Sequence, residues 1–280
     1  MRFTRILNAF GVGEMYFSYR TRCANRFFPL PKAQYALSFD LDHERDIRAV
    51  PRLLKILAKH RIPAAFACVG RWIECYPTVH RQIVHEGHEI INHTYSHPDS
   101  MEFNARHFQE LSSAEQQEEI RRCDRVCRSI LRHTPIGFRT PHFGRAHTPV
   151  VYPLLRKLRY QYSSSTIAYH APYYSAPYRM DGIVEIPLGC SPSNPRTPFD
   201  SWSSRVSPLP NFVTDEEFFH EFQRILDLIK RHRAFTTHYF DPAHMVRNGL
   251  IDRFCRALTQ RAIPALRYRD LLQRVPIRNS

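Results

Sequence analysis

The hydrophobic positions of the chain fall into short apolar runs that alternate with longer amphipathic stretches. The apolar runs have the length of buried strands, and we expect seven of them, at 35–39, 64–69, 88–91, 136–139, 160–164, 183–186 and 234–237. The amphipathic stretches predict helices at 47–60, 77–86, 112–132, 149–158, 214–232 and 250–260. Strands alternating with helices indicate a parallel sheet with helices outside it. We therefore expect an α/β fold, a closed or nearly closed (β/α) barrel of about seven parallel strands, with a doubly wound open sheet as the alternative.

Local signals mark two helix starts and one irregular stretch. Ser112 with Glu115, and Thr214 with Glu217, have the spacing of a capping box. The stretch 170–213 breaks the alternation of strands and helices and is rich in Pro, Ser and Tyr. A connection of that length inside a compact domain is either disordered or part of a binding site.

Residues 1–32 form an N-terminal extension ahead of a predicted domain at 33–275. The apolar run 6–12 contains Asn8, ends before Glu14 and lacks a small-residue cleavage site, which disfavours a secretory signal peptide. We expect a helix or strand packed on the domain, or a segment lying on a membrane surface, because Arg alternates with Phe, Tyr and Met here. No stretch approaches the ~20 apolar residues of a spanning helix.

Composition is that of a globular protein with a strong basic excess. The chain has 280 residues, 43% of them hydrophobic and 24% charged, with a formal net charge of +14. The excess is almost all arginine and is spread along the chain without a nucleic-acid motif. It favours an anionic substrate or peripheral contact with an anionic membrane over nucleic-acid binding. Seven irregularly spaced cysteines without a CxxC pair favour reduced thiols in a cytoplasmic protein.

Ligand-type side chains follow the first and third predicted strands. Asp40 and Asp42 follow the first, and His93 and His97 follow the third, with an i, i+4 spacing that suits one helical turn. In such folds active-site groups lie at the carboxyl ends of strands, so both pairs should meet at one mouth. One carboxylate and two imidazoles leave positions open for water and substrate, as in hydrolytic zinc sites, although the same set also serves non-haem iron. Taken singly, Asp42 is explained as a helix cap and the histidines as a surface pair.

Two further polar residues follow later strands. Arg139 comes after the fourth strand, where its guanidinium could hold a carboxylate through paired hydrogen bonds, or be one of many loop arginines. His238 comes after the seventh strand, where it could donate a proton to a leaving amine, or be a core histidine bonded to backbone.

Together the segments SFDLD, NHTYSH, GFRTPHFG and TTH resemble the motifs of the polysaccharide deacetylases, the NodB-homology group or carbohydrate esterase family four. The resemblance runs from about residue 35 to about residue 275, and NHTYSH is its most specific part. The Asp-x-Asp spacing is similar to a branch with peptidoglycan deacetylase-like members and members that hydrolyse cyclic imides or allantoin. Other relatives deformylate lipid-linked sugars. The resemblance implies a distorted (β/α) barrel, which agrees with the strand count.

The resemblance also implies roles for matching residues. Asp40 is the implied catalytic base, Arg139 orients Asp40, and His238 is the implied general acid. The implied metal ligands are Asp42, His93 and His97. We expect the substrate groove to include Pro141, Tyr95 and Phe143. The expected ion is Zn²⁺, with Co²⁺, Mn²⁺, Fe²⁺ and Ni²⁺ as alternatives.

One position departs from the family pattern. Many members carry an aspartate after the fifth strand that tunes the acid histidine, and Ser163 stands there in this chain. The carboxylates that could substitute for it are Asp241, Glu185 and Asp200, and His244 is a rival for the acid role.

The function we expect is a metal-dependent hydrolase that removes an N-acyl group, expected to be N-acetyl, from an amino sugar in a glycan or glycan precursor. The substrate could be lipid-linked or anionic, and the expected compartment is the cytoplasm, with contact to the inner face of the membrane. One alternative keeps the site but acts on a formamide, cyclic imide or ureide. Another is an inactive homologue that binds glycan in the same groove, which the change to Ser163 would favour.

Overall fold

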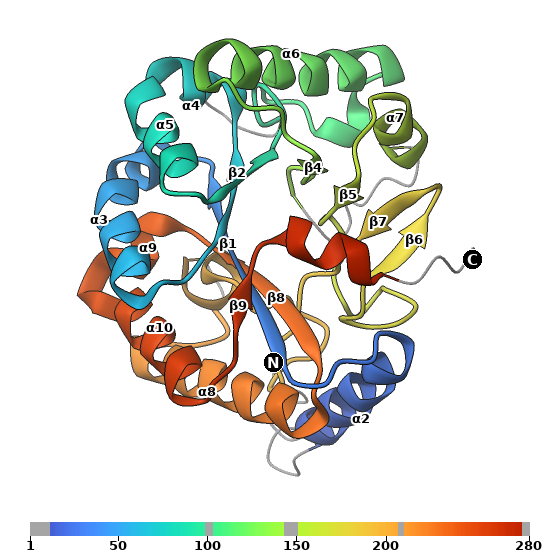
Figure 1. Cartoon of the computed structure of the whole chain (residues 1–280), viewed down its shortest axis with the longest axis vertical. Coiled ribbons are helices and arrows are strands. Elements are labelled where there is room, and N and C mark those ends of the chain that lie inside the picture. The colour runs from blue at the N-terminus through green and yellow to red at the C-terminus, as the bar shows by residue number, and fades with distance from the viewer. Residues whose placement is uncertain (1–11, 99–102, 143–150, 207–209, 276–280) are drawn as a thin grey trace.

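The computed structural model describes residues 12–98, 103–142, 151–206 and 210–275, which form an α/β structure around one curled sheet (Figure 1). Its nine strands run in the order β6-β7-β5-β4-β3-β2-β1-β8, and β9 pairs with β1. The strands are β1 (Gln34–Leu41), β2 (Ala65–Cys68), β3 (Glu89–Asn92), β4 (Gly137–Phe138), β5 (Tyr162–Ser163), β6 (Tyr178–Met180), β7 (Ile183–Glu185), β8 (Phe235–Phe240) and β9 (Ala265–Leu266). The pair β6–β7 is antiparallel and the other pairings are parallel.

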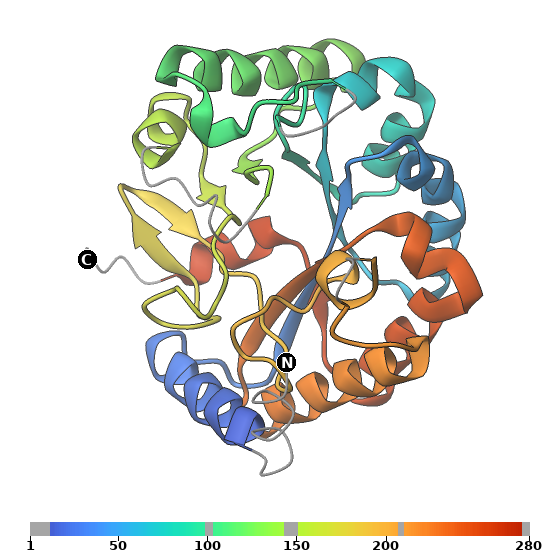
Figure 2. The same ribbon diagram turned by 180° about the vertical axis from the view of Figure 1, so that it is seen from behind.

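The helices cover the outside of the sheet, as the two opposite views show (Figures 1 and 2). The α-helices are α2 (Val12–Phe27), α3 (Glu44–His60), α4 (Gly70–Cys75), α5 (Pro77–His85), α6 (Ser113–Leu131), α7 (Val151–Lys157), α8 (Asp215–His232), α9 (Pro242–Val246) and α10 (Leu250–Gln260). Short 3-10 and π-helical turns lie at η1 (Phe108–Glu110), η2 (Trp202–Val206), η3 (Arg247–Gly249) and η4 (Tyr268–Arg274). The expected α/β barrel with mostly parallel strands is therefore confirmed.

The described strands do not close into a complete barrel, because β6 and β8 are the two ends of the strand order and do not pair with each other. The segment 188–189 narrows the gap between these ends. Leu188 N–H donates to the Thr166 carbonyl at 2.8 Å, and Gly189 N–H donates to the Thr237 carbonyl in β8 at 2.7 Å. The backbone comes so close here that a Cβ on Gly189 would lie 2.4 Å from Thr236 Oγ1. A glycine is thus required where the sheet curls round on itself.

The predicted capping boxes are present and fix two of the long helices. Ser112 Oγ accepts from Glu115 N–H, and the Glu115 carboxylate accepts from Ser112 N–H at 2.8 Å, at the start of α6. Thr214 and Glu217 make the same reciprocal pair at the start of α8. Each pair satisfies two of the N–H groups that a helix start leaves without partners.

The extension ahead of the sheet contains helix α2, which packs along α8 (Figures 1 and 2). Ser18 Oγ lies 2.6 Å from His232 Nε2, and Arg224 donates to Glu14 at 2.7 Å. Phe17 is buried and makes an edge-on contact with the Tyr174 ring. Within the described ranges, no helix is long and apolar enough to cross a membrane.

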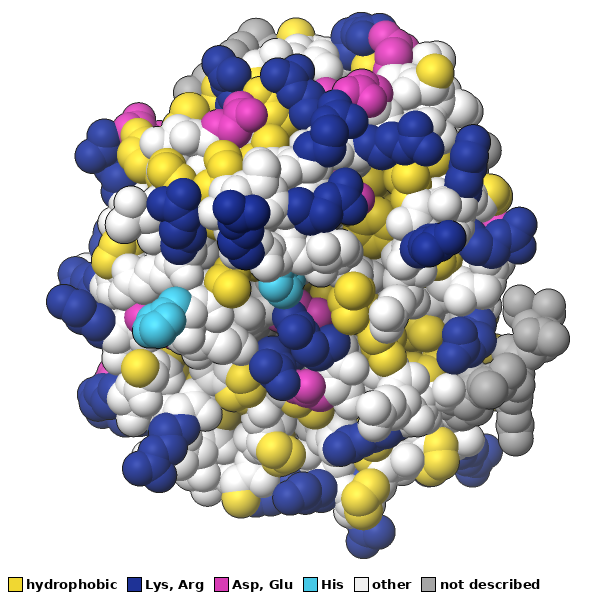
Figure 3. Space-filling view, turned by 45° about the horizontal axis from the view of Figure 1, so that its top comes forward, with side chains coloured by type: hydrophobic (Ala, Val, Ile, Leu, Met, Phe, Trp, Pro, Cys, Tyr) yellow, Lys and Arg dark blue, Asp and Glu magenta, His cyan; other side chains and the backbone are white. Residues whose placement is uncertain are grey.

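The basic excess is distributed over the surface. On the face shown in Figure 3, Lys and Arg side chains are scattered over several elements and acidic side chains are few between them. This distribution agrees with the even spacing of basic residues in the sequence.

Candidate active site

The polar residues predicted to meet at the sheet mouth come from β1, β3 and β4, and β2 lies between β1 and β3. Asp40 lies near the end of β1 and Asp42 just beyond it, while His93 follows β3. Arg139 directly follows β4, which pairs with β3. The parallel pairing brings these carboxyl ends to one edge of the sheet, where the side chains can converge.

Asp42, His93 and His97 form a group with the geometry of a metal site. Asp42 Oδ1 lies 3.3 Å from His93 Nε2 and 3.5 Å from His97 Nε2. Ligand atoms about 2.0–2.2 Å from one tetrahedral ion lie roughly 3.4 Å apart, so these separations fit a shared cation. The carboxylate atom is buried and accepts no hydrogen bond within the described part of the chain. The donor set and its spacing therefore fit a divalent metal.

A hydrogen bond orients His93 as a ligand, and burial prepares His97. His93 Nδ1 lies 2.8 Å from the Arg139 carbonyl, so the ring donates there and leaves the Nε2 lone pair facing Asp42. Burial lowers the pKa of His97 to about 3, which keeps its imidazole in the neutral form that binds metals. Burial alone would raise the pKa of Asp42, but the two imidazoles hold it below its usual value.

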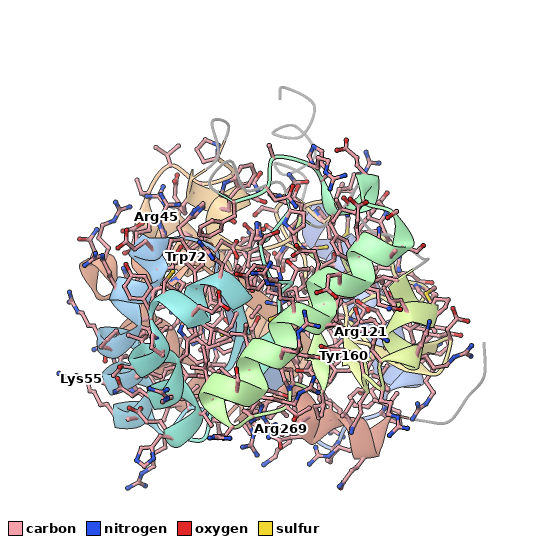
Figure 4. The ribbon with its side chains drawn as sticks, turned by 90° about the horizontal axis from the view of Figure 1, so that it is seen from above. Arg45, Lys55, Trp72, Arg121, Tyr160 and Arg269 are labelled. Carbon is pink, nitrogen blue, oxygen red and sulfur yellow. The ribbon has the colours of Figure 1, made fainter. Side chains whose placement is uncertain are left out.

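The two histidines are brought together by a strained loop, whereas a helical turn was expected. Thr94 and His97 both have left-handed backbone conformations, with φ of 64° and 49°. The Asn92 side chain accepts from Thr94 N–H at 2.9 Å, and Thr94 Oγ1 accepts from His97 N–H at 3.1 Å. Asn92 also donates to Tyr160, which lies beside α6 in Figure 4. The asparagine thus anchors the loop to the barrel and holds His93 next to His97.

Asp40 is buried beside Arg139, whose guanidinium Nη1 donates to its Oδ1. Burial raises the pKa of Asp40, and the charge of Arg139 opposes that rise. The guanidinium is itself fixed by three further bonds. Its Nη2 donates to Tyr268 Oη at 2.8 Å and to Ser164 Oγ at 3.2 Å, and its Nε donates to the Ser164 carbonyl at 3.2 Å. Asp40 therefore faces the mouth in a fixed orientation.

A second carboxyl group, Asp200, lies near Asp40. Asp200 is fully buried, its Oδ1 accepts from Ser203 N–H, and it interacts with the Tyr239 hydroxyl. Burial raises the pKa of Asp200 to about 7, and the charge of Asp40 adds to that rise. The Tyr239 ring also lies under the Arg139 guanidinium, with Cζ 5.7 Å from the ring centroid. Asp200 thus belongs to the same polar cluster, which the sequence alone identified only as one of three candidate carboxylates.

The structure does not bring His238 to this cluster. His238 pairs with Leu37 in the β1–β8 ladder, so its side chain shares a face with Leu37, and Asp40, three residues on, points to the opposite face. The ring lies against Phe199, and its Nδ1 lies 2.9 Å from Tyr35 Oη. Burial lowers the pKa of His238 to about 3, so at neutral pH the imidazole is neutral and lacks the acidic proton of an imidazolium. The expected general acid is instead a core histidine on the helix side of β8.

The expected groove residues have mixed placements. The Tyr95 side chain lies between α4 and α6: its hydroxyl donates to Glu74 at 2.7 Å, and Arg122 stacks over its ring. These contacts explain its burial without a substrate. Pro141 is buried directly after the Arg139 loop, and Phe143 lies outside the described residues. His142 was not singled out from the sequence, and its ring centroid is 5.2 Å from that of His97.

Ser163, which stands where many family members have an aspartate, is part of a chain of hydrogen bonds between β5 and the loop after β4. Ser163 Oγ donates to Ser165 Oγ at 2.9 Å, and Ser165 Oγ accepts from Thr140 N–H at 3.0 Å in the loop after β4.

The Glu185 carboxylate is already hydrogen-bonded, since it accepts from the backbone N–H groups of Ser165 and Thr166 at 2.8 Å. The His244 ring lies against Phe218 of α8, in the outer layer. Asp241 accepts from Ser201 Oγ at 2.8 Å, and burial raises its pKa, with smaller contributions from the charges of Asp46 and Asp42.

Comparison with known proteins adds a family to this geometry. A family model described as polysaccharide deacetylase matches residues 29–163. The peptidoglycan-N-acetylglucosamine deacetylase of Bacillus cereus is 40% identical over 76 residues, which cover 27% of this chain and 27% of that protein. The chitooligosaccharide deacetylase of Sinorhizobium fredii is 45% identical over 49 residues, 18% of this chain and 23% of that protein. The matched stretches thus span about a quarter of the length of these curated relatives.

The fold comparison extends over most of the chain. A crystal structure of a Mycobacterium smegmatis protein assigned as a polysaccharide deacetylase superposes with a TM-score of 0.73. It covers 88% of this chain and 91% of that chain at 18% sequence identity. At that identity the likeness concerns the fold, and it agrees with the curled barrel described above.

Proposed function

Because the chain belongs to the polysaccharide deacetylase family, we propose that it is a metal-dependent hydrolase that removes an N-acyl group, with acetyl as the proposed group, from an amino sugar in a glycan or glycan precursor. The observation that carries this proposal is the convergence of three ligand-type atoms beside a buried carboxylate. Asp42, His93 and His97 face one point, and Asp40, which is hydrogen-bonded to Arg139, lies next to them.

The proposed cofactor is a divalent cation held by Asp42, His93 and His97, with Zn²⁺ as the first candidate. Such an ion lowers the pKa of water towards about 7 and polarises the carbonyl of a bound amide. The protein supplies the remaining functions. His93 is held in the tautomer that presents Nε2, and His97 is kept neutral by burial.

Asp40 is the proposed general base. Its Oδ1 is engaged by Arg139, which leaves Oδ2 to accept a proton from the attacking water. The Arg139 bonds to Ser164 and Tyr268 prevent the carboxylate from rotating away from the mouth. Positioned proton transfer of this kind contributes about 10²- to 10⁴-fold to a rate.

Asp200 is the proposed proton donor for the departing amine, in place of His238. It is buried in the polar cluster with Tyr239, and its pKa of about 7 means that a large fraction carries a proton at neutral pH. As the C–N bond breaks, the amine nitrogen takes this proton, and the acid product leaves with the oxygen of the attacking water. The proton taken up by Asp40 then restores Asp200 through water, so that the sum is amide plus water to acid plus amine.

The substrate is proposed from the relatives that match in sequence. Their names refer to peptidoglycan N-acetylglucosamine and to chitooligosaccharide, which are both polymers of N-acetylated amino sugars. The formal net charge of +14 supports an anionic or lipid-linked carrier for the sugar. We propose a reducing compartment, the cytoplasm, because all seven cysteines are free.

A substrate panel tests the proposal. Chitooligosaccharides, peptidoglycan fragments, a formylated amino sugar and a cyclic ureide are incubated with the metal-loaded protein, and released amine or ring-opened product is measured. We expect amine release from an N-acetylated sugar, and at least ~100-fold less from Asp40→Asn, since the base is lost. Asp227→Asn is the matched control, because Asp227 is exposed and pairs with Arg261 on the surface.

Three outcomes would overturn parts of the proposal. Turnover of the ureide or formamide alone would change the bond that is cleaved. Tight glycan binding without turnover of any member of the panel would identify an inactive glycan-binding homologue. Full turnover by Asp40→Asn would place the base elsewhere.

A further inference from the structure

Helix α2 carries most of the exposed large hydrophobic side chains in the described part of the chain. Six such side chains are exposed there, and four of them lie on this one helix: Val12, Met15, Tyr19 and Phe27. Met15 and Tyr19 retain 63% and 56% of their full exposure. The other two, Trp202 and Val213, come from separate segments. Single exposed apolar residues are common on proteins, but four on one 16-residue helix form a continuous feature.

The four side chains lie on one stripe of the helix. At about 100° per residue, Met15, Tyr19 and Phe27 project within roughly 60° of the direction of Val12. The buried residues of the helix, Phe17, Thr21 and Ala24, project on the opposite side, towards the domain. α2 therefore has two apolar faces. One is buried against the domain, and the other points away from the protein. The stripe is defined here as Val12, Met15, Tyr19 and Phe27.

Charge around the stripe is of one sign. Arg22 and Arg26 are exposed. Arg22 projects roughly 80° from Val12, just beyond Met15, and Arg26 projects roughly 40° from Val12 on the same side, between Met15 and Tyr19. Glu14 is the single acidic residue of the helix, and it lies on the other side, where Arg224 binds it at 2.7 Å. Exposed Lys32 follows the helix in sequence. An apolar stripe that carries arginines along one side and no acidic residue is the pattern of helices that lie in the plane of a membrane interface.

Aromatic rings from a distant loop widen the apolar surface. The Phe27 ring lies 4.2 Å, centroid to centroid, from Tyr173, and the Tyr16 ring lies 6.3 Å from Tyr169. Arg20 donates to the Tyr16 hydroxyl at 2.7 Å and so fixes that ring in place. Tyrosine has the amphipathic character of residues found at the level of lipid headgroups. The surface therefore combines a rigid helix, aromatic rings and arginines on one side of the molecule.

We propose that the stripe on α2 docks the protein on an anionic phospholipid surface, with the helix parallel to the membrane plane. Insertion of Met15 and Tyr19 among the acyl chains removes their apolar area from water, while Arg22 and Arg26 contact lipid phosphates. A second copy of the chain fits this face less well. Two such faces would bring arginines of like charge together, on molecules that each have a formal net charge of +14.

Vesicle binding of the full chain tests this inference without reference to catalysis. Co-sedimentation is measured with vesicles of phosphatidylcholine alone and with vesicles that also contain phosphatidylglycerol. We expect binding to the anionic vesicles, weakened by salt because exposed charges are screened. Met15→Ser with Tyr19→Ser should reduce the partition coefficient at least ~10-fold, and Arg22→Gln with Arg26→Gln by about fivefold per charge.

Val213→Ser is the matched control, because Val213 is a still more exposed apolar residue away from α2. It should bind vesicles like the wild type. All variants change exposed side chains, and unchanged thermal unfolding verifies that they fold. Equal vesicle binding by wild type and Met15→Ser/Tyr19→Ser would overturn the inference, as would absence of binding by the wild type. If light scattering shows a wild-type dimer that this double variant dissociates, and vesicles do not bind, the stripe is a subunit interface instead.

Discussion

His238 offers a sharp test of which face of β8 faces the substrate. The structure places it in the core, where burial lowers its pKa to about 3 from an unfolded value of 6.5. Below about pH 6.5 the unfolded chain therefore binds a proton at this residue that the folded chain does not. Because the unfolded state binds more protons, stability falls as the pH falls. Between about pH 8 and about pH 5 this one group costs about 2 kcal/mol.

The perturbation is His238→Asn, which keeps a polar atom near Tyr35 Oη but removes the titrating ring. We expect a loss of about 1–2 kcal/mol at about pH 8, since ring packing against Phe199 is lost. The further loss between about pH 8 and about pH 5 should shrink by about 2 kcal/mol relative to wild type. Urea unfolding at the two pH values measures both quantities. His80→Asn is the matched control, because His80 is another buried histidine, with a pKa lowered to about 4.

Activity distinguishes the core role from a catalytic one. Under conditions in which the variant is folded, His238→Asn should hydrolyse substrate within about threefold of wild type, as should His80→Asn, because neither residue touches the reacting atoms. A 100-fold loss of turnover in His238→Asn alone, with the wild-type pH dependence of stability intact, would refute the placement of His238 and restore it as the general acid.

Two further predictions concern proton donation and barrel packing. Asp200→Asn should lower kcat at least ~100-fold and abolish the decline of activity above about pH 7, because the acid must be protonated to act; a pH–rate profile that keeps its alkaline limb would contradict this. Gly137→Ala should destabilise the fold by about 1–3 kcal/mol in urea unfolding, because the added Cβ would lie 1.9 Å from the Tyr162 ring, and an unchanged midpoint would contradict the tight packing of β4 on β5.

The elements that the sequence predicted well are the long ones with a regular pattern. The strand over 35–39 and the helix over 214–232 were found within a few residues of β1 and α8. The missed elements are short, such as α4 (Gly70–Cys75) and β9 (Ala265–Leu266), which have too few residues to show a period. For helix α2 the sequence is compatible with several alternatives, since apolar residues on two of its faces obscure the usual one-sided pattern.

The sequence predicts which residues form the site, but it does not predict the backbone conformation that brings them together. The sequence predicts Asp42 after the first strand and His93 and His97 after the third, and it predicts that they meet because parallel strands end at one edge of the sheet. The left-handed backbone conformation of Thr94 could not be predicted, since threonine seldom adopts this conformation. The hydrogen bond from Thr94 N–H to the Asn92 side chain stabilises it.

His238 shows how one strand boundary changes a functional assignment. The predicted strand ended at residue 237, which would put His238 at the mouth. In the structure β8 continues to Phe240, so His238 is an interior strand residue. Because side chains alternate between the two faces of a strand, the His238 side chain points to the helix side of the sheet. The same extension places Tyr239 on the inner face, beside Arg139. Asp200 lies in the long irregular stretch, where sequence patterns give no register at all.

The central claim is that Asp42, His93 and His97 together hold a divalent ion in a hydrolase. The most direct measurement is the metal content of the purified, Zn²⁺-loaded and desalted protein by mass spectrometry, for wild type, His93→Ala and the surface control Asp227→Asn. We predict about one ion per chain in wild type and in the control, and loss of that ion in His93→Ala. An ion retained at full stoichiometry by His93→Ala, or absent from the wild type after loading, would contradict the site.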